Sequence, residues 1–146
     1  MKIIIGNDHA AVKLKHEIIE HLKSKNIAVT DAGAQAAGEL DYPDYAFNVC
    51  KKVTSGEYDF GILLCGTGIG MCMSANKING IRAVVCSDTF SSKLSRSHNN
   101  ANVLCMGERV VGTGLAKMIV DAFLEEDFEG GRHALRLNKI TELENK

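Results

Sequence analysis

Residues 61–70, GILLCGTGIG, decide the fold of this chain. The first half is an apolar run without a polar break, which is typical of a strand buried on both faces of a parallel sheet. The second half is rich in glycine and leads into residues 71–77, a segment of helical composition. A strand, a tight loop and a helix in this order bring bare backbone N–H groups together at the start of the helix, where they can hold an anion. Because Cys65 is the last residue before the loop, the sequence predicts a thiol beside an anion-binding site.

The rest of the chain alternates strand and helix patterns around this stretch. Helical patterns separate the apolar segments, with Pro43 at a first helical position and Asn79-Gly80 closing the short helix after the glycine loop. Right-handed crossovers between successive strands build a parallel sheet that helices cover on both sides. The predicted strands are 2–6, 27–30, 61–65, 81–86 and 103–106.

Three further segments carry specific predictions. In the last long helix, the residues expected to face the core are Leu115, Met118, Ile119, Ala122 and Phe123. A polar loop is expected over residues 32–41. The tail from residue 130 to 146 has a helical but only weakly amphipathic pattern, so it is expected to pack on another subunit. The whole chain, 1–146, is predicted to form one domain.

Length and charge restrict the class of protein. The 146 residues are 45% hydrophobic, which suits one domain with a sizeable core. Lys and Arg number 17 against 18 Asp and Glu, and the formal charge of -1 argues against a general nucleic-acid binder. The early apolar run at residues 3–5 is too short for a signal peptide or a membrane span. These features predict a soluble cytoplasmic protein without a nucleic-acid or membrane partner.

The cysteine pattern argues against disulfides and metal. Five cysteines are present without a C-x-x-C pair, and Cys50, Cys86 and Cys105 lie in apolar segments where buried free thiols are expected. No His, Cys or Asp cluster has the spacing of metal ligands, so neither a metal nor another cofactor is predicted.

Chemically useful side chains follow three of the predicted strands. Ligands of parallel α/β sheets bind beyond the carboxyl ends of the strands, where the strand order reverses. A carboxylate, an imidazole, a thiol, a backbone anion site and a guanidinium are therefore expected at one edge. They belong to Asp8 and His9 after the first strand, Cys65 and the glycine loop after the third, and Arg109 after the fifth.

Six motifs, spread over nearly the whole chain, carry a family resemblance. They are NDHA at 7–10, DYPDYA at 41–46, GILLCGTGIGM at 61–71, NKINGIRA at 76–83, LSRSHNNANVL at 94–104 and EGGRHALR at 129–136. In this order the motifs resemble the ribose-5-phosphate isomerase B family. The resemblance implies a Rossmann-like three-layer α/β sandwich with a five-stranded parallel sheet, assembled as a homodimer or a dimer of dimers. It also implies metal-independent interconversion of ribose 5-phosphate and ribulose 5-phosphate, and some members also accept allose 6-phosphate.

Galactose-6-phosphate isomerase belongs to the same superfamily and divides its site residues between two different subunits. This chain holds both the thiol motif and the histidine and arginine motifs, so it resembles the branch with a single type of chain. The choice between five-carbon and six-carbon sugar phosphates stays open.

An aldose–ketose isomerisation removes a proton beside a carbonyl and passes through an enediolate, so it needs a base and an oxyanion site. By resemblance, Cys65 is the proton acceptor and the Thr67 hydroxyl assists it. An ordinary thiol is mostly protonated at neutral pH, but a helix N-terminus favours its thiolate. The loop residues that hold the enediolate are Gly66, Thr67, Gly68, Ile69 and Gly70.

The remaining roles also come from the resemblance. His98 opens the sugar ring with Asp8 as its partner, Asn99 binds a sugar hydroxyl and Tyr42 lines the pocket. His133 receives no role. The phosphate ligands are His9, Arg109, Arg132 and Arg136, because arginine forks match phosphate oxygens.

Topology predicts that two subunits share each site. Cys65 follows a strand, whereas His98 precedes one, so the two lie at opposite edges of the sheet within one chain. If both act on one sugar, His98 comes from the neighbouring subunit of a two-fold dimer.

Two other classes of protein compete with the isomerase. A dinucleotide-binding module fits Gly66-x-Gly68 after a strand and Asp88 after the next strand, although Met71 holds the place of the third glycine. A non-catalytic sugar-phosphate sensor fits the anion site, but it needs neither a base nor a ring-opening residue.

Overall fold

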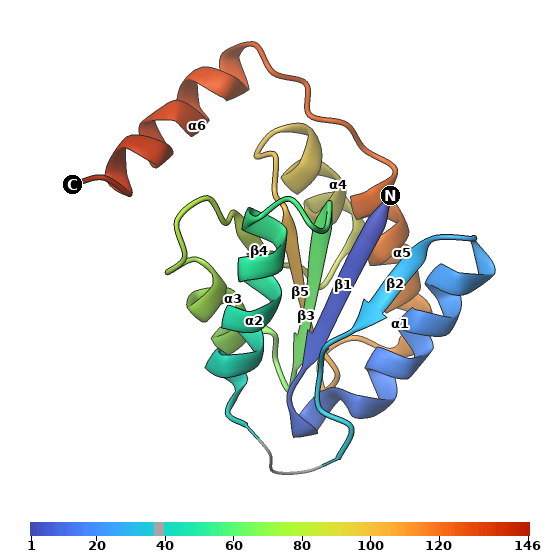
Figure 1. Ribbon diagram of the computed structural model, residues 1–146. Helices are drawn as coiled ribbons and strands as arrows, with labels where there is room; N and C mark the ends of the chain where they lie inside the picture. Colours follow the sequence, from blue (N-terminus) through green and yellow to red (C-terminus); the bar gives the residue numbers. More distant parts are fainter. Residues whose placement is uncertain (37–39) are drawn as a thin grey trace.

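The computed structural model describes residues 1–36 and 40–146, and within them the chain forms one five-stranded sheet (Figure 1). Every strand pair is parallel, and the order is β2-β1-β3-β5-β4. The strands are β1 Lys2–Asn7, β2 Ala28–Asp31, β3 Phe60–Cys65, β4 Ala83–Val85 and β5 Val103–Gly107. The predicted parallel α/β sandwich is therefore confirmed. Of the polar loop predicted over 32–41, residues 37–39 lie outside the described residues.

Helices connect the strands and cover both faces of the sheet (Figure 1). They are the 3-10 turn η1 His9–Ala11, α1 Val12–Ser24, α2 Tyr42–Thr54, α3 Ile69–Ala75, α4 Thr89–Ser97, α5 Thr113–Leu124 and α6 Arg132–Leu143. Among the helices of the described residues, none is both long and apolar enough to cross a membrane.

The core has two layers because side chains along each strand alternate between the faces. In β3, Ile62 and Leu64 join the cluster that contains buried residues of α1 and α5. Leu63 and Cys65 join the opposite cluster, under α2 and α3. Cys65 therefore points to the α2 and α3 side of the sheet.

The predicted core face of α5 was partly wrong. The buried residues are Ala116, Ile119, Val120 and Phe123, whereas Leu115 is exposed and Met118 is 60% exposed. The stripe that faces the sheet follows the i, i+3, i+4, i+7 spacing from Ala116, and this turns Leu115 and Met118 towards solvent.

All strands run in the same direction, but the order in which the chain adds them to the sheet reverses beside β3. The chain passes from β1 outward to β2, crosses back to β3, and later inserts β5 between β3 and β4. Ligand sites in such sheets lie beyond the carboxyl ends of the strands at these points. The sheet therefore directs attention to the segments that follow β1, β3 and β5.

The predicted tail helix is α6, which stands apart from the sheet in Figure 1, beyond the amino ends of the strands. Its Leu135 and Leu143 are 68% and 64% exposed. Glu144 contacts the backbone N–H of Gly80 at 3.2 Å. The expected packing of this tail on another subunit stays a prediction.

Candidate active site

The glycine loop holds the thiol at the end of β3. Gly68 has a φ of +80°, a conformation that glycine adopts without a steric penalty. This turn aims the Gly68 N–H at Cys65, and the N–H donates to Sγ at 3.0 Å. Ile69 begins α3, and its N–H donates to the Thr67 hydroxyl at 3.3 Å. The sulfur, which is largely buried, thus faces a backbone hydrogen-bond donor just before the start of α3.

Two predicted substrate-binding side chains lie against the glycines of this loop. A Cβ on Gly66 would be 3.2 Å from Nη1 of Arg109. A Cβ on Gly70 would be 2.8 Å from the ring of Tyr42. The absence of side chains at these two positions therefore lets the guanidinium and the phenol approach the loop backbone.

Backbone hydrogen bonds join the carboxyl ends of three strands. Glu108 N–H donates to the Cys65 carbonyl at 2.9 Å, and Arg109 N–H donates to the Gly66 carbonyl at 3.1 Å. On the other side of β3, the Asp8 N–H after β1 donates to the Leu64 carbonyl at 3.2 Å. The segments after β1, β3 and β5 thus form one edge, as the sequence predicted.

Asp8 and His9 differ in their surroundings at this edge. The Asp8 side chain is buried and accepts a hydrogen bond from the Ala10 N–H at 2.9 Å, which caps η1. His9 follows it on the surface. Asp8 is thus held in place, while the His9 imidazole is open to an anion in solution.

Four other predicted site residues lie away from this edge within one chain. His98 ends α4 and Asn99 follows it, just before the start of β5, where the Asn102 carbonyl accepts from Gly61 N–H at the start of β3. Arg132 and Arg136 lie on α6 and line a hollow of about 570 Å³. The structure therefore separates the predicted residues into a group around Cys65 and a group around His98.

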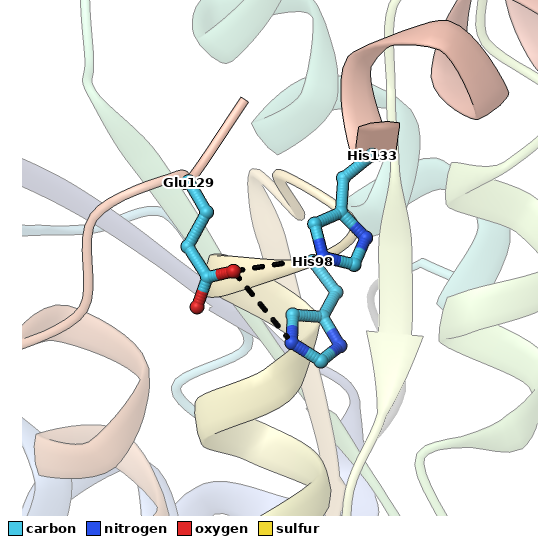
Figure 2. A group of neighbouring side chains, drawn as sticks. All are labelled: His98, Glu129 and His133. Carbon is cyan, nitrogen blue, oxygen red and sulfur yellow. Dashed lines mark ion pairs between the residues drawn. The ribbon is translucent and has the colours of Figure 1, made fainter. Parts of the chain in front are cut away.

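The second group contains a close pair of histidines (Figure 2). The rings of His98 and His133 stack with centroids 4.2 Å apart and planes 11° from parallel. Oε2 of Glu129 is 3.5 Å from Nε2 of His133 and 4.0 Å from Nε2 of His98. Burial, and then the nearby His98, lower the pKa of His133 below its ordinary value.

Within one chain, this group gives His98 a neighbouring carboxylate that the sequence did not predict. Within one chain the carboxylate beside His98 is Glu129, and Asp8 lies at the other edge of the sheet. The sequence analysis missed Glu129 and gave His133 no role. The four-residue spacing of these two was the available signal, but it did not indicate the presence of His98.

The cysteines that were predicted to be buried are buried, and Cys72 differs from them in its pKa. All five are free thiols and lie in the described parts of the chain, and burial raises the pKa of Cys50 to about 12 and of Cys86 to about 11. A hydrogen bond with Cys105, only partly offset by burial, lowers the pKa of Cys72 to about 7. Cys72 is half-buried, and its thiol donates to the Ala83 carbonyl at 3.5 Å.

The carboxylate of the dinucleotide-binding alternative has a structural role. Asp88 caps α4, and its Oδ1 accepts from the Ser91 N–H at 2.6 Å. The carboxylate that a ribose would need is therefore already engaged in capping the helix.

The fold and this edge define a parallel α/β domain with a thiol and a glycine loop at the reversal point of its sheet. The family described as Ribose/Galactose Isomerase matches residues 3–140. The chain therefore belongs to the ribose/galactose isomerase family, and the family resemblance seen in the sequence is confirmed.

Similar proteins agree with this assignment. Ribose-5-phosphate isomerase B of Escherichia coli (strain K12) is 52% identical over 145 residues, which cover 99% of this chain and 97% of the relative. A structure of Clostridium thermocellum ribose-5-phosphate isomerase B matches with a TM-score of 0.97 at 50% identity, covering 99% and 98% of the two chains. The crystal structure of ribose-5-phosphate isomerase B from Mycoplasma genitalium with bound ribulose 5-phosphate matches with a TM-score of 0.93 at 45% identity, covering 99% and 97%.

Proposed function

We propose that this chain is an aldose–ketose isomerase that interconverts ribose 5-phosphate and ribulose 5-phosphate through an enediolate, with Cys65 as the general base. The observation that carries the proposal is the hydrogen bond from Gly68 N–H to the Cys65 sulfur at 3.0 Å, beside a helix N-terminus. The similarity to proteins named ribose-5-phosphate isomerase B supports the substrate.

The reaction needs one group to remove a proton and others to hold the resulting oxyanion. The Cys65 thiolate takes the proton from the carbon beside the carbonyl and returns it to the neighbouring carbon. We assign the enediolate oxygen to the backbone N–H groups of the 66–70 loop, in which those of Gly68 and Ile69 also donate to Cys65 Sγ and to the Thr67 hydroxyl. The Thr67 hydroxyl, which is exposed two residues after Cys65, assists the transfer.

The phosphate ligands come from two parts of the chain. Arg109 lies against Gly66 and His9 lies on the same edge. Arg132 and Arg136 are four residues apart and therefore share one face of α6. Guanidinium forks on that face suit the oxygens of a phosphate.

We infer that each active site is built from two subunits of a homodimer, in which the α6 tail packs at the interface. Cys65 ends β3, whereas His98 lies just before β5, at the opposite edge of the same sheet. A two-fold axis that brings the second edge of one subunit to the first edge of the other completes both sites. Asp8 of one subunit then meets His98 of its neighbour, which opens the sugar ring, while Asn99 binds a hydroxyl and Tyr42 lines the pocket.

A subunit-mixing experiment tests the shared site. Cys65→Ala and His98→Ala are each expected to be inactive, and mixing them after reversible dissociation should restore activity. In a mixed dimer one site carries both substitutions and the other carries neither. Absence of recovery, with mixed dimers demonstrated by native mass spectrometry, would contradict the shared site.

The activity itself is tested by direct assay of the purified protein. Ribose 5-phosphate should be isomerised, allose 6-phosphate should be turned over as a side activity, and a chelator should leave both rates unchanged. Binding of sugar phosphate without turnover would identify a sensor and overturn the proposed function. Calorimetric binding of NAD would instead support the dinucleotide-binding module.

A further inference from the structure

The cluster of His98, Glu129 and His133 joins two separate segments of the chain at the amino end of the sheet (Figure 2). His98 ends α4, Glu129 lies in the connection after α5, and His133 is in the first turn of α6. The Glu129 N–H donates to the carbonyl of Ser97 at 3.0 Å, which fixes the connection to the end of α4. The three side chains are therefore held together by the backbone.

One atom in this cluster is buried and lacks a partner. His133 is only 7% exposed, and within residues 1–36 and 40–146 no hydrogen-bond partner is present for its Nε2. The nearest acceptor, Oε2 of Glu129 at 3.5 Å, is too distant for a good hydrogen bond. Because buried polar atoms normally have partners, this nitrogen is available to an additional ligand.

We propose that Nε2 of His98, Nε2 of His133 and a carboxylate oxygen of Glu129 bind a Zn²⁺ ion, and that this ion inhibits the enzyme. Two imidazoles and one carboxylate are ligands that zinc prefers, with a fourth position left for water. The three donor atoms lie within 4.8 Å of one another. Bonds of about 2.1 Å in a tetrahedron separate neighbouring ligand atoms by roughly 3.4 Å, so the donor atoms must approach one another by up to about 1.4 Å.

A metal ion lies near the plane of each imidazole that binds it, so the two rings must turn out of their parallel stack to point at one ion. His133 is fixed by burial, whereas the His98 side chain is 34% exposed and has room to rotate. Arg132 and Arg136 add positive charge nearby, but both are exposed, so solvent and salt screen their repulsion.

Inhibition follows because a nitrogen that binds zinc cannot exchange a proton with a sugar. This consequence rests on the proposed ring-opening role of His98, whereas the binding of zinc does not. The ion is an inhibitor and not a cofactor. This agrees with the expectation that a chelator leaves the rate of isomerisation unchanged.

Calorimetric titration of the full-length, metal-free protein with ZnCl₂ tests the site. One ion should bind per chain, and Glu129→Gln and His133→Ala should each weaken binding by more than about 10-fold, since even residues that only support a ligand have effects of this size. Glu129→Gln keeps the shape of an exposed side chain, so it remains informative if His133→Ala fails to fold. His16→Ala, which removes an exposed histidine of α1, and Cys72→Ser should bind zinc as the wild type does. Unchanged binding in Glu129→Gln, or loss of binding in Cys72→Ser, would overturn the proposal.

The activity measurement separates this inference from the proposed function. Zn²⁺ should inhibit isomerisation by the wild type, a chelator should reverse the inhibition, and Glu129→Gln should require more than about 10-fold more zinc. Equal zinc sensitivity of Glu129→Gln and wild type would overturn the inhibitory site. The titration is repeated on Cys65→Ala, where full zinc binding is expected whether or not the wild type is an isomerase. Loss of zinc binding in Cys65→Ala would assign the ion to the thiol and overturn the proposal.

Discussion

Substitution of Gly107 by alanine acts directly on the position of the catalytic loop. Gly107 ends β5, and a Cβ there would be 2.5 Å from Cα and 2.6 Å from the carbonyl carbon of Thr67. These are backbone atoms, so no side-chain rotation relieves the overlap. The loop from Gly66 to Gly68 must move to accommodate the methyl group.

The size of the effect follows from these distances. An ordinary contact begins at 3.4 Å, so the Thr67 backbone must shift by about 0.9 Å. A displacement of roughly 1 Å in a positioned catalytic group costs about 100-fold in rate. Overpacking of this kind also lowers the free energy of unfolding by about 1–3 kcal/mol. Gly107→Ala is therefore expected to fold, with kcat reduced by about 100-fold.

The measurement compares kcat for ribose 5-phosphate with the stability from denaturant unfolding. Gly112→Ala is the matched control, because a Cβ on Gly112 meets no atom of the described residues within 4 Å. The control should keep both kcat and stability near those of the wild type. If Gly107→Ala is less stable but retains full kcat, the loop position does not determine the rate and the reasoning is wrong.

Three further predictions concern the thiol, the ring-opening residue and a half-buried ion pair. Cys65→Ala should lose at least about 100-fold in turnover, the usual contribution of a general base, yet still bind ribose 5-phosphate in calorimetry. Inactivation by iodoacetamide should follow labelling of Cys65 in mass spectrometry, and inactivation that follows Cys72 labelling would show that the wrong thiol was assigned. His98→Asn should slow turnover of the cyclic sugar far more than proton exchange on an open-chain analogue, whereas equal losses would remove the ring-opening role. Burial raises the pKa of Asp121, but hydrogen bonds from Lys25 and His21 outweigh it and lower the pKa below its ordinary value. A lowered pKa stabilises the fold above the unfolded value of about 3.9, and this contribution is lost as the pH falls through the folded pKa. Unfolding curves between pH 7 and pH 3 should show a smaller loss of stability for Asp121→Asn than for the wild type, and identical pH profiles would refute the assignment.

The residues of β3 and of the glycine loop were sufficient to predict the central part of the fold. The apolar run before Cys65 can only be buried on both faces, and the glycines after it permit a positive φ at Gly68 and a close approach of Arg109. The burial and the turn depend on residues near one another in the chain, whereas Arg109 reaches the loop only because β5 pairs with β3. The parallel sheet and the position of the glycine loop were therefore predictable.

Packing between distant segments decided the rest. Which face of α5 is buried depends on the neighbours of that helix, so the pattern alone assigned Leu115 and Met118 wrongly. The lowered pKa of Cys72 depends on Cys105, which reaches it only when β5 is inserted beside β3.

The histidine cluster shows this division most clearly. Glu129 and His133 are four residues apart, a spacing visible in the sequence, but His98 is 31 residues before Glu129. It joins them only because the Glu129 backbone is hydrogen-bonded to the end of α4. Sequence periodicity reports which residues share one element, whereas a site made from two elements depends on how the chain packs them together, and that is a property of the tertiary structure.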